Sequence, residues 1–90
     1  MRLDLFLKLA RLVKRRSVAQ DMIRIGAVRI NGREGKPSSL VRLGDSIEIA
    51  YPRRVLKVKV LEDDEKQLRR KAEAYEVQEE RRVDPEEVPW

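Results

Sequence analysis

The sequence predicts an α+β fold, in which two N-terminal helices pack on a small antiparallel sheet and a charged helix follows. Apolar residues recur at helical spacing near the N-terminus, and they alternate with polar residues in the middle of the chain, as in strands. The last third consists mostly of strong helix formers. With 90 residues, we expect a domain over residues 1–61, a charged helical extension over 62–82 and a flexible tail over 83–90.

Apolar spacing predicts the first helix over residues 3–13. Two apolar rows lie side by side, and the remaining sector holds Asp4, Lys8, Arg11 and, if the helix continues, Arg15. At about 100° per residue, these four side chains fall within about 60° of arc. We therefore expect a helix that is buried on two sides and exposes one basic strip.

A second, short helix is predicted from Val18 to Ile25. Ser17 and Gln20 have the spacing of a capping box, in which the serine caps the helix and the glutamine reaches back to it. Gly26 then lies where a left-handed glycine commonly ends a helix. We expect the apolar side of this helix to face the first one.

The sheet is predicted from three segments that alternate apolar and polar residues: 28–30, 47–51 and 55–61. Asn31-Gly32, which follows the first of them, is the strongest two-residue signal for a hairpin turn. Residues 33–43 are rich in turn formers, so we expect a loop there.

The charged C-terminal helix carries only a narrow apolar row, formed at helical spacing by Leu68, Ala72 and Tyr75. This row either docks on the domain or binds a partner. The charges also divide along the chain: residues 1–60 hold 15 basic and 5 acidic side chains, whereas residues 61–90 hold 6 basic and 11 acidic ones. This division indicates a polyanion-binding domain followed by an acidic appendage.

Missing residue types exclude several functions. The chain has no histidine and no cysteine, which removes zinc sites built on them, histidine or cysteine nucleophiles, and disulfides. We expect no metal and no cofactor. Apolar runs reach only two or three residues, too short to span a membrane, and the N-terminus lacks the apolar stretch of a signal peptide. The expected location is the cytoplasm.

A cluster of cations joins the two predicted helices. Lys14, Arg15 and Arg16 can neutralise phosphates, and the arginine forks can bind phosphate oxygens bidentately. Structured RNA is recognised through its shape, phosphates and 2′-hydroxyls, a task that suits a rigid basic face. Aromatic residues are scarce, which disfavours stacking on single-stranded bases. The alternative is a solvated basic surface without a ligand.

The order of these features resembles the S-four RNA-binding domain. The resemblance covers about residues 2–51 and rests on these positions: Arg2-Leu3-Asp4, Leu7, Arg11, Arg16-Ser17, Ala19, Ile23, Gly26, Val28, Ile30-Asn31-Gly32, Lys36-Pro37-Ser38 and Gly44-Asp45. It implies the S-four-like (alpha-L) RNA-binding fold and the binding of structured RNA, usually ribosomal RNA. The sequence departs from the family at Arg15, where many members carry serine.

The resemblance also implies a set of RNA contacts. The family's contact positions are matched by Arg2, Asp4, Arg11, Arg16 and Ser17. The residues themselves add candidates from the cation cluster, the capping box and a polar loop near the sheet: Lys8, Lys14, Arg15, Gln20, Lys36 and Ser38. The capping box by itself also accounts for Ser17 and Gln20.

Within the family, a short stand-alone chain with an acidic C-terminal part resembles the ribosome-associated quality-control factors. This implies binding to rRNA of the large ribosomal subunit and to tRNA on a stalled subunit. It also implies a partner, a quality-control elongation factor that adds alanine tails to stalled nascent chains. The alternative is the related heat-shock group, which recycles or rescues free large subunits that carry a nascent chain but typically has a basic C-terminal extension. Away from the ribosome we expect a monomer.

Two other functional classes are an enzyme and a protein adaptor. S-four domains often precede catalytic modules, but no such module follows here, so we expect no enzyme. The acidic segment could act as an adaptor that recruits a protein partner. In that case, truncation after residue 61 is expected to spare RNA affinity.

Overall fold

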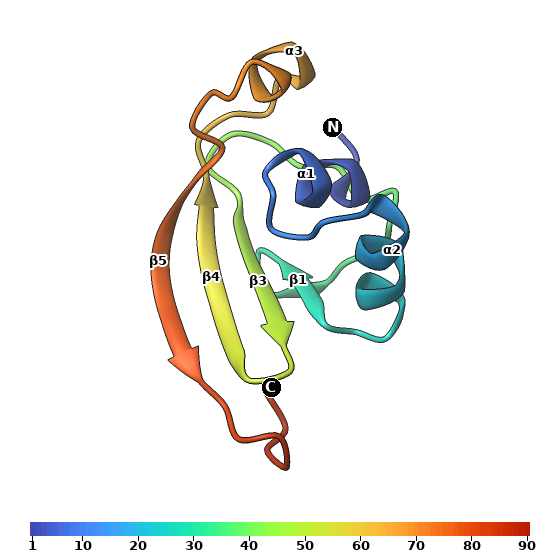
Figure 1. The fold of residues 1–90 in the computed structure, drawn as a ribbon, viewed down its shortest axis with the longest axis vertical. Coiled ribbons are helices and arrows are strands. Elements are labelled where there is room, and N and C mark those ends of the chain that lie inside the picture. The colour runs from blue at the N-terminus through green and yellow to red at the C-terminus, as the bar shows by residue number, and fades with distance from the viewer.

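The computed structural model describes every residue from 1 to 90 (Figure 1). Neighbouring strands all pair antiparallel in one sheet, in the order β2-β1-β3-β4-β5. In chain order the elements are α1 (Leu3–Leu9), α2 (Arg16–Arg24), β1 (Val28–Ile30), β2 (Arg33–Glu34), β3 (Ser46–Tyr51), β4 (Arg54–Val60), α3 (Glu65–Arg69) and β5 (Tyr75–Arg82).

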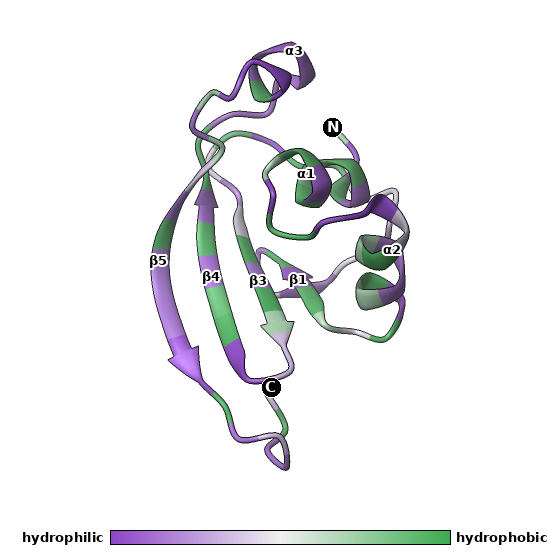
Figure 2. Ribbon diagram, in the orientation of Figure 1, coloured by the Kyte–Doolittle hydropathy of each residue, from purple (hydrophilic) through white to green (hydrophobic).

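One hydrophobic core joins the N-terminal helices to the sheet. α1 and α2 lie on the same side of the sheet, and the apolar segments of helices and strands face each other between them (Figures 1 and 2). The largest fully buried side chains come from both layers, among them Phe6 and Leu7 of α1, Ile23 of α2 and Ile47 of β3. Each such side chain contributes about 1.5–3 kcal/mol through burial. The predicted α+β class is confirmed.

The first helix is shorter than its apolar pattern indicates. α1 ends at Leu9 because Arg11 has a φ of +63°, in the left-handed region that a helix cannot pass through. Leu12 and Val13 remain buried because the chain folds back and both of their N–H groups donate to Leu7 O, at 3.0 and 3.2 Å. The predicted helix over 3–13 and its continuous basic strip are therefore wrong.

The second helix begins without the predicted capping box. α2 starts at Arg16, and its N-cap residue Arg15 makes no side-chain cap hydrogen bond. The Gln20 amide instead donates to Asp4 of α1. Gly26 has a φ of +81°, and its N–H donates to Ile23 O at the end of the helix, as expected.

The strands match the three predicted segments closely, and one further strand is present. Asn31 and Gly32 have φ values of +50° and +78°, which a type I′ hairpin turn requires. This turn pairs β1 with a short β2, so the loop predicted over residues 33–43 is wrong at Arg33 and Glu34.

The C-terminal third differs most from the prediction. Only Glu65–Arg69 is helical, whereas residues 75–82 form β5, which pairs with β4 along its whole length. The helical extension predicted over 62–82 is therefore wrong. Opposite charges across the two strands favour pairing over the helix: the partners are Lys59 with Glu76 and Lys57 with Glu79.

The last residues also contact the body of the protein. Val83 is buried and its N–H donates to Arg53 O at 3.0 Å. The Trp90 indole donates to Gly26 O at 3.1 Å, and the Arg29 guanidinium lies 4.8 Å from the centroid of the indole ring. Among the helices, none has both the length and the apolar character that a membrane crossing needs.

Candidate nucleic-acid interface

A buried carboxylate lies where the two N-terminal helices meet. Asp4, in the first turn of α1, is fully buried and is the one charged residue in the core. The sequence prediction placed it on an exposed strip, and this placement is wrong. A buried charge is costly unless it is paired and hydrogen-bonded, so its partners decide the structure of this region.

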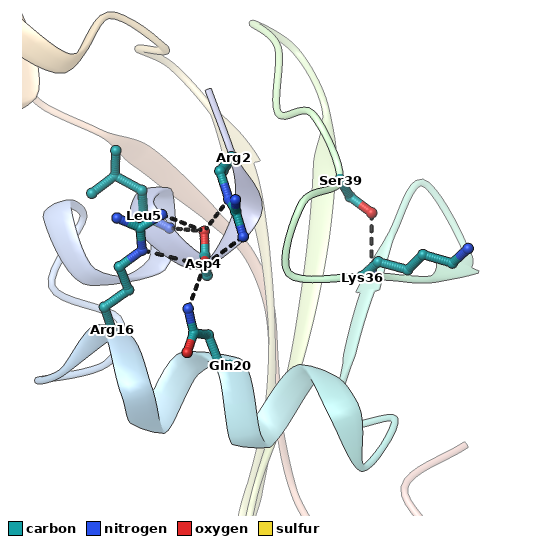
Figure 3. Close-up of polar contacts among 7 residues, drawn as sticks. All are labelled: Arg2, Asp4, Leu5, Arg16, Gln20, Lys36 and Ser39. Carbon is teal, nitrogen blue, oxygen red and sulfur yellow. Dashed lines mark hydrogen bonds and ion pairs between the residues drawn. The ribbon is translucent and has the colours of Figure 1, made fainter.

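Two arginines and one amide converge on Asp4 (Figure 3). Arg2 forms a fork, with Nε 3.2 Å from Oδ1 and Nη2 3.2 Å from Oδ2. From α2, Arg16 Nη2 donates to Oδ1 at 3.4 Å and Gln20 Nε2 donates to Oδ2 at 2.8 Å. Leu5 N–H donates to Oδ1 at 2.8 Å. We call Asp4, Arg2, Arg16 and Gln20 the Asp4 network.

The network keeps the carboxylate ionised. Burial by itself raises the pKa of Asp4. The hydrogen bonds from Gln20, Arg16 and Arg2 act in the opposite direction and, together with the one from Leu5 N–H, hold the pKa of Asp4 below its ordinary value of 3.8. Asp4 is therefore ionised near neutral pH, where both arginines share its charge.

Sharing one anion leaves positive charge at the surface. The side chains of Arg2 and Arg16 are 48% and 42% exposed, although Asp4 beneath them is closed to solvent. Arg16 Nε lies 3.2 Å from Asp4 Oδ2 and is itself buried, so the exposed part of this side chain is the rest of the guanidinium. Both guanidiniums are thus held by a fixed acid on one side and keep donors for an external anion on the other.

The loop between the helices presents further cations from a fixed backbone. Leu12 and Val13 are buried, and the Tyr51 hydroxyl donates to Leu12 O at 2.6 Å. Burial raises the pKa of Tyr51, which keeps this donor protonated. Lys14 and Arg15 follow this anchor and are exposed.

We call the exposed or half-exposed cations of α1, this loop and the start of α2 the basic corner: Arg2, Lys8, Arg11, Lys14, Arg15 and Arg16. All six are predicted RNA contacts. Arg11 itself has the left-handed backbone conformation that ends α1, so its exposed side chain leaves the chain just after the helix. The structure therefore leaves all six cations accessible on these neighbouring segments, while their contact with RNA stays a prediction.

Ser17 and Gln20 lie close together in the sequence but differ in environment. Ser17 is exposed in the first turn of α2, and its hydroxyl caps nothing. Gln20 is half-buried and donates to Asp4. Ser17 is thus available to a ligand, whereas Gln20 acts by positioning the carboxylate.

The polar loop after β2 packs against the start of α1. Leu3 N–H donates to Ser39 O at 2.7 Å, and Asp4 N–H donates to Pro37 O at 3.2 Å. Lys36 and Ser38 are exposed in this loop, and the Lys36 side chain extends away from the Asp4 network (Figure 3). The two predicted contacts therefore flank the Asp4 network and do not join it.

The predicted partner-binding row is not a helical stripe. Leu68 of α3 is buried in the core, Ala72 follows the helix, and Tyr75 begins β5. Leu68 docks on the protein's own core and so is not free to bind a partner. Tyr75 is half-buried and packs against the same core.

Chemically, the region can bind anions, because its exposed side chains are cationic. No group of three or more histidine, cysteine, aspartate or glutamate side chains is placed to hold a metal ion. Sequence reasoning identified Arg2, Asp4 and Arg16 but missed that Gln20 belongs with them. The sequence pattern that could have revealed this role is the position of Gln20, a polar residue on the same side of α2 as the buried residues Ala19 and Ile23.

Comparisons with known proteins agree with this geometry. The sequence model of the S4 domain matches residues 1–47. The RQC P-site tRNA stabilizing factor of Streptococcus pneumoniae is 39% identical over 85 residues, which cover 93% of this chain and 97% of that protein. The factor of the same name from Bacillus subtilis is 42% identical over 62 residues, covering 69% of this chain and 72% of the relative.

A solved structure shows the same fold. The trimeric structure of Vibrio cholerae heat shock protein 15 superposes with a TM-score of 0.76 at 26% identity, covering 87% of this chain and 81% of the other. Its similarity extends beyond the S4 match and includes much of the C-terminal third. With the S4 match and the two stabilizing factors above, the chain belongs to the S4 domain family, in the group of the RQC P-site tRNA stabilizing factors.

Proposed function

We propose that this chain binds structured RNA of the large ribosomal subunit through the basic corner and acts in ribosome-associated quality control. The observation that carries the proposal is the Asp4 network, in which one buried acid holds two half-exposed arginines in fixed positions. Fixed guanidiniums lose little freedom on binding, so more of each phosphate contact appears as affinity. The names of the relatives, which refer to RQC and to P-site tRNA, support the same role.

The mode of binding follows from the shape of the surface. The cations lie on α1, α2 and the loop between them, and the aromatic side chains needed for stacking are absent from the basic corner. Such a surface suits the phosphates and 2′-hydroxyls of a folded RNA, not splayed single-stranded bases. We therefore propose rRNA as the main ligand and the tRNA on a stalled subunit as a second one.

The proposed cellular role is to support the addition of alanine tails to nascent chains on stalled large subunits. A separate elongation factor would add the alanine tail, while this chain would hold RNA and carry out no chemistry itself. The proposed location is the cytoplasm, and the proposed state away from the ribosome is a monomer. Sedimentation-equilibrium ultracentrifugation tests that state. A trimer of the kind solved for the Vibrio relative would give a molar mass three times that of the monomer.

The second candidate is a heat-shock-type role in rescuing free large subunits that carry a nascent chain. The fold similarity to heat shock protein 15 favours it. The two roles differ in the product: deletion of the gene should abolish C-terminal alanine tails under the first role and leave them unchanged under the second.

The direct test of RNA binding is sedimentation with purified large subunits that carry peptidyl-tRNA. The proposal expects the protein in the subunit fraction at physiological salt and its gradual release as salt rises, because phosphate contacts weaken with ionic strength. Absence from the subunit fraction at physiological salt would contradict the proposed function. Charge reversal at Lys14 and Arg15 together, which make no side-chain hydrogen bond within the fold, should remove the protein from that fraction.

A further inference from the structure

Two cations of the basic corner and two further ones line a depression between α1 and α3. The larger part, about 270 Å³, is lined by Lys8, Leu9, Arg11, Leu68 and Arg69. A smaller part of about 140 Å³ shares three of these residues and adds Lys71. Leu68 anchors α3 in the core, so the position of the short helix beside α1 is fixed. We call these two parts the α1–α3 depression.

The charges of this depression are one-sided. Its lining includes four cations and no carboxylate: Lys8, Arg11, Arg69 and Lys71. Glu65, one turn before Arg69, lies 3.6 Å from the Arg69 guanidinium, but both side chains are about half exposed and such surface pairs are weak. Cations gathered around one hollow repel each other, and a bound polyanion would relieve this repulsion.

We propose that the α1–α3 depression binds phosphate oxygens of an RNA backbone, as a contact additional to the basic corner. The inference rests on the proposed function, because Lys8 and Arg11 line this depression and belong to the basic corner as well. It assigns Arg69 and Lys71, from the part of the chain that is acidic overall, to the RNA-binding surface. The S4 match ends at residue 47, so neither residue lies within it.

Helix dipoles account for only part of this arrangement. Lys8 and Arg69 lie in the last turns of α1 and α3, where a cation stabilises a helix without any ligand. Arg11 and Lys71 lie beyond those turns, with φ values of +63° and +64°. A side chain costs about 1–2 kcal/mol in that region, where glycine costs nothing. Cations at two such positions around one depression indicate a use for the side chains themselves.

Two charge-matched double variants test the proposal. Arg69→Gln with Lys71→Gln removes two cations of the depression, while Lys66→Gln with Arg70→Gln removes two from the same region that do not line it. Binding to purified large ribosomal subunits is measured over a range of KCl concentrations. We expect about tenfold weaker binding for the first pair at physiological salt, and a salt slope lower by about 1.4–1.8, the value for two phosphate contacts. The control pair should change both quantities much less.

The outcomes separate this inference from the proposed function. Equal binding and equal salt slopes for the two pairs would overturn the α1–α3 depression and leave the basic corner intact. Weaker binding without a change in slope would also overturn it, because that result indicates a protein contact. If the wild-type chain does not bind the subunits, the proposed function itself fails. The swapped variant Arg69→Lys with Lys71→Arg should keep the wild-type slope, which checks that charge and not local folding is responsible.

Discussion

Asp4 Oδ2 on α1 lies 3.2 Å from Arg16 Nε on α2, so a fully buried acid and a half-exposed base join the two helices. Gln20, one turn further along α2, donates to the same carboxylate at 2.8 Å. The contact links fold and binding: the helix junction needs the carboxylate, and the carboxylate fixes the guanidinium that faces solvent. Stability and RNA affinity should therefore change together when Asp4 is altered.

The first prediction concerns Asp4→Asn. The amide keeps the shape but removes the charge, and its NH2 group faces donors from Arg2, Arg16 or Gln20. We expect a loss of about 2–3 kcal/mol in the free energy of unfolding, which corresponds to a Tm lower by about 10–20 °C. Differential scanning calorimetry measures it. Asp21→Asn is the control, because Asp21 is exposed and forms only a surface pair with Arg24 at 3.7 Å. Equal Tm changes for the two variants would contradict the prediction.

The second prediction concerns the stability of the fold at acidic pH. The pKa of Asp4 is lower in the folded protein than its ordinary value of 3.8, so the ionised form stabilises the fold. This contribution is complete above the ordinary pKa and is lost as pH falls through the lower folded pKa. Urea unfolding from about pH 7 to about pH 2 should show that the wild type loses more stability than Asp4→Asn below about pH 4. The other carboxylates titrate in both proteins and cancel, so parallel curves would show that Asp4 is not a stabilising anion.

The third prediction separates binding from folding. Lys14 and Arg15 are exposed and donate no side-chain hydrogen bond within the protein. Replacing either by alanine should leave stability within about 0.5 kcal/mol and weaken binding to large subunits by about 1.5–3 kcal/mol. Filter binding combined with thermal melts measures both. Arg53→Ala, in the β3–β4 turn, is the matched control and should not change binding. An equal loss of binding for Arg53→Ala would indicate general electrostatic attraction.

Local sequence patterns suffice to predict the turns that need a left-handed backbone. The hairpin turn at Asn31-Gly32 and the helix end at Gly26 were predicted because the left-handed backbone there favours particular residues. The end of α1 could not be predicted, since Leu12 and Val13 continue its apolar pattern while packing from a loop. Their burial depends on β3, whose Tyr51 hydroxyl holds Leu12 O.

The remaining errors have a common physical cause, which is contact between residues distant in sequence. Residues 75–82 favour helix by composition, yet pairing with Lys57 and Lys59 of β4 makes them a strand. Asp4 was identified through the family resemblance, but its burial was not, because a lone acid is rarely enclosed. Only the arrival of Gln20 and Arg16 from another helix makes that burial possible.

The fourth prediction concerns Gly35, whose backbone lies close to the Leu3 side chain of α1. A Cβ atom on Gly35 would lie 2.7 Å from Leu3 Cδ2, and Leu3 is fully buried. Gly35→Ala should therefore destabilise the protein by about 1–3 kcal/mol through overpacking. Urea unfolding in a double-mutant cycle with Leu3→Val tests the cause: the cost of Gly35→Ala should be smaller when Leu3 is shortened. An additive cycle would show that this contact is not responsible.

The fifth prediction concerns truncation after residue 61. If the acidic segment were a separate appendage, its removal would spare folding and RNA affinity. In the structure, however, the removed part supplies β5, which pairs with β4 from Arg54 to Val60, and Leu68, which is 5% exposed in the core. Loss of Leu68 alone corresponds to about 2–5 kcal/mol, a large share of the stability of a small domain. We therefore expect the truncated chain to lose cooperative melting in circular dichroism and to bind RNA poorly.

Two controls identify which part of the segment matters. Truncation after Val83 keeps β5 and the Val83 N–H bond to Arg53 O, so it should melt cooperatively with a Tm near that of the full chain. Leu68→Ala in the full chain should lower stability by about 2–5 kcal/mol while the strand remains. A chain ending at residue 61 that melts like the full protein would mean that β4 tolerates an open edge and that β5 serves another purpose. The structure argues against this, because Val58 and Val60, which face the core from β4, would then lie in the edge strand of the sheet.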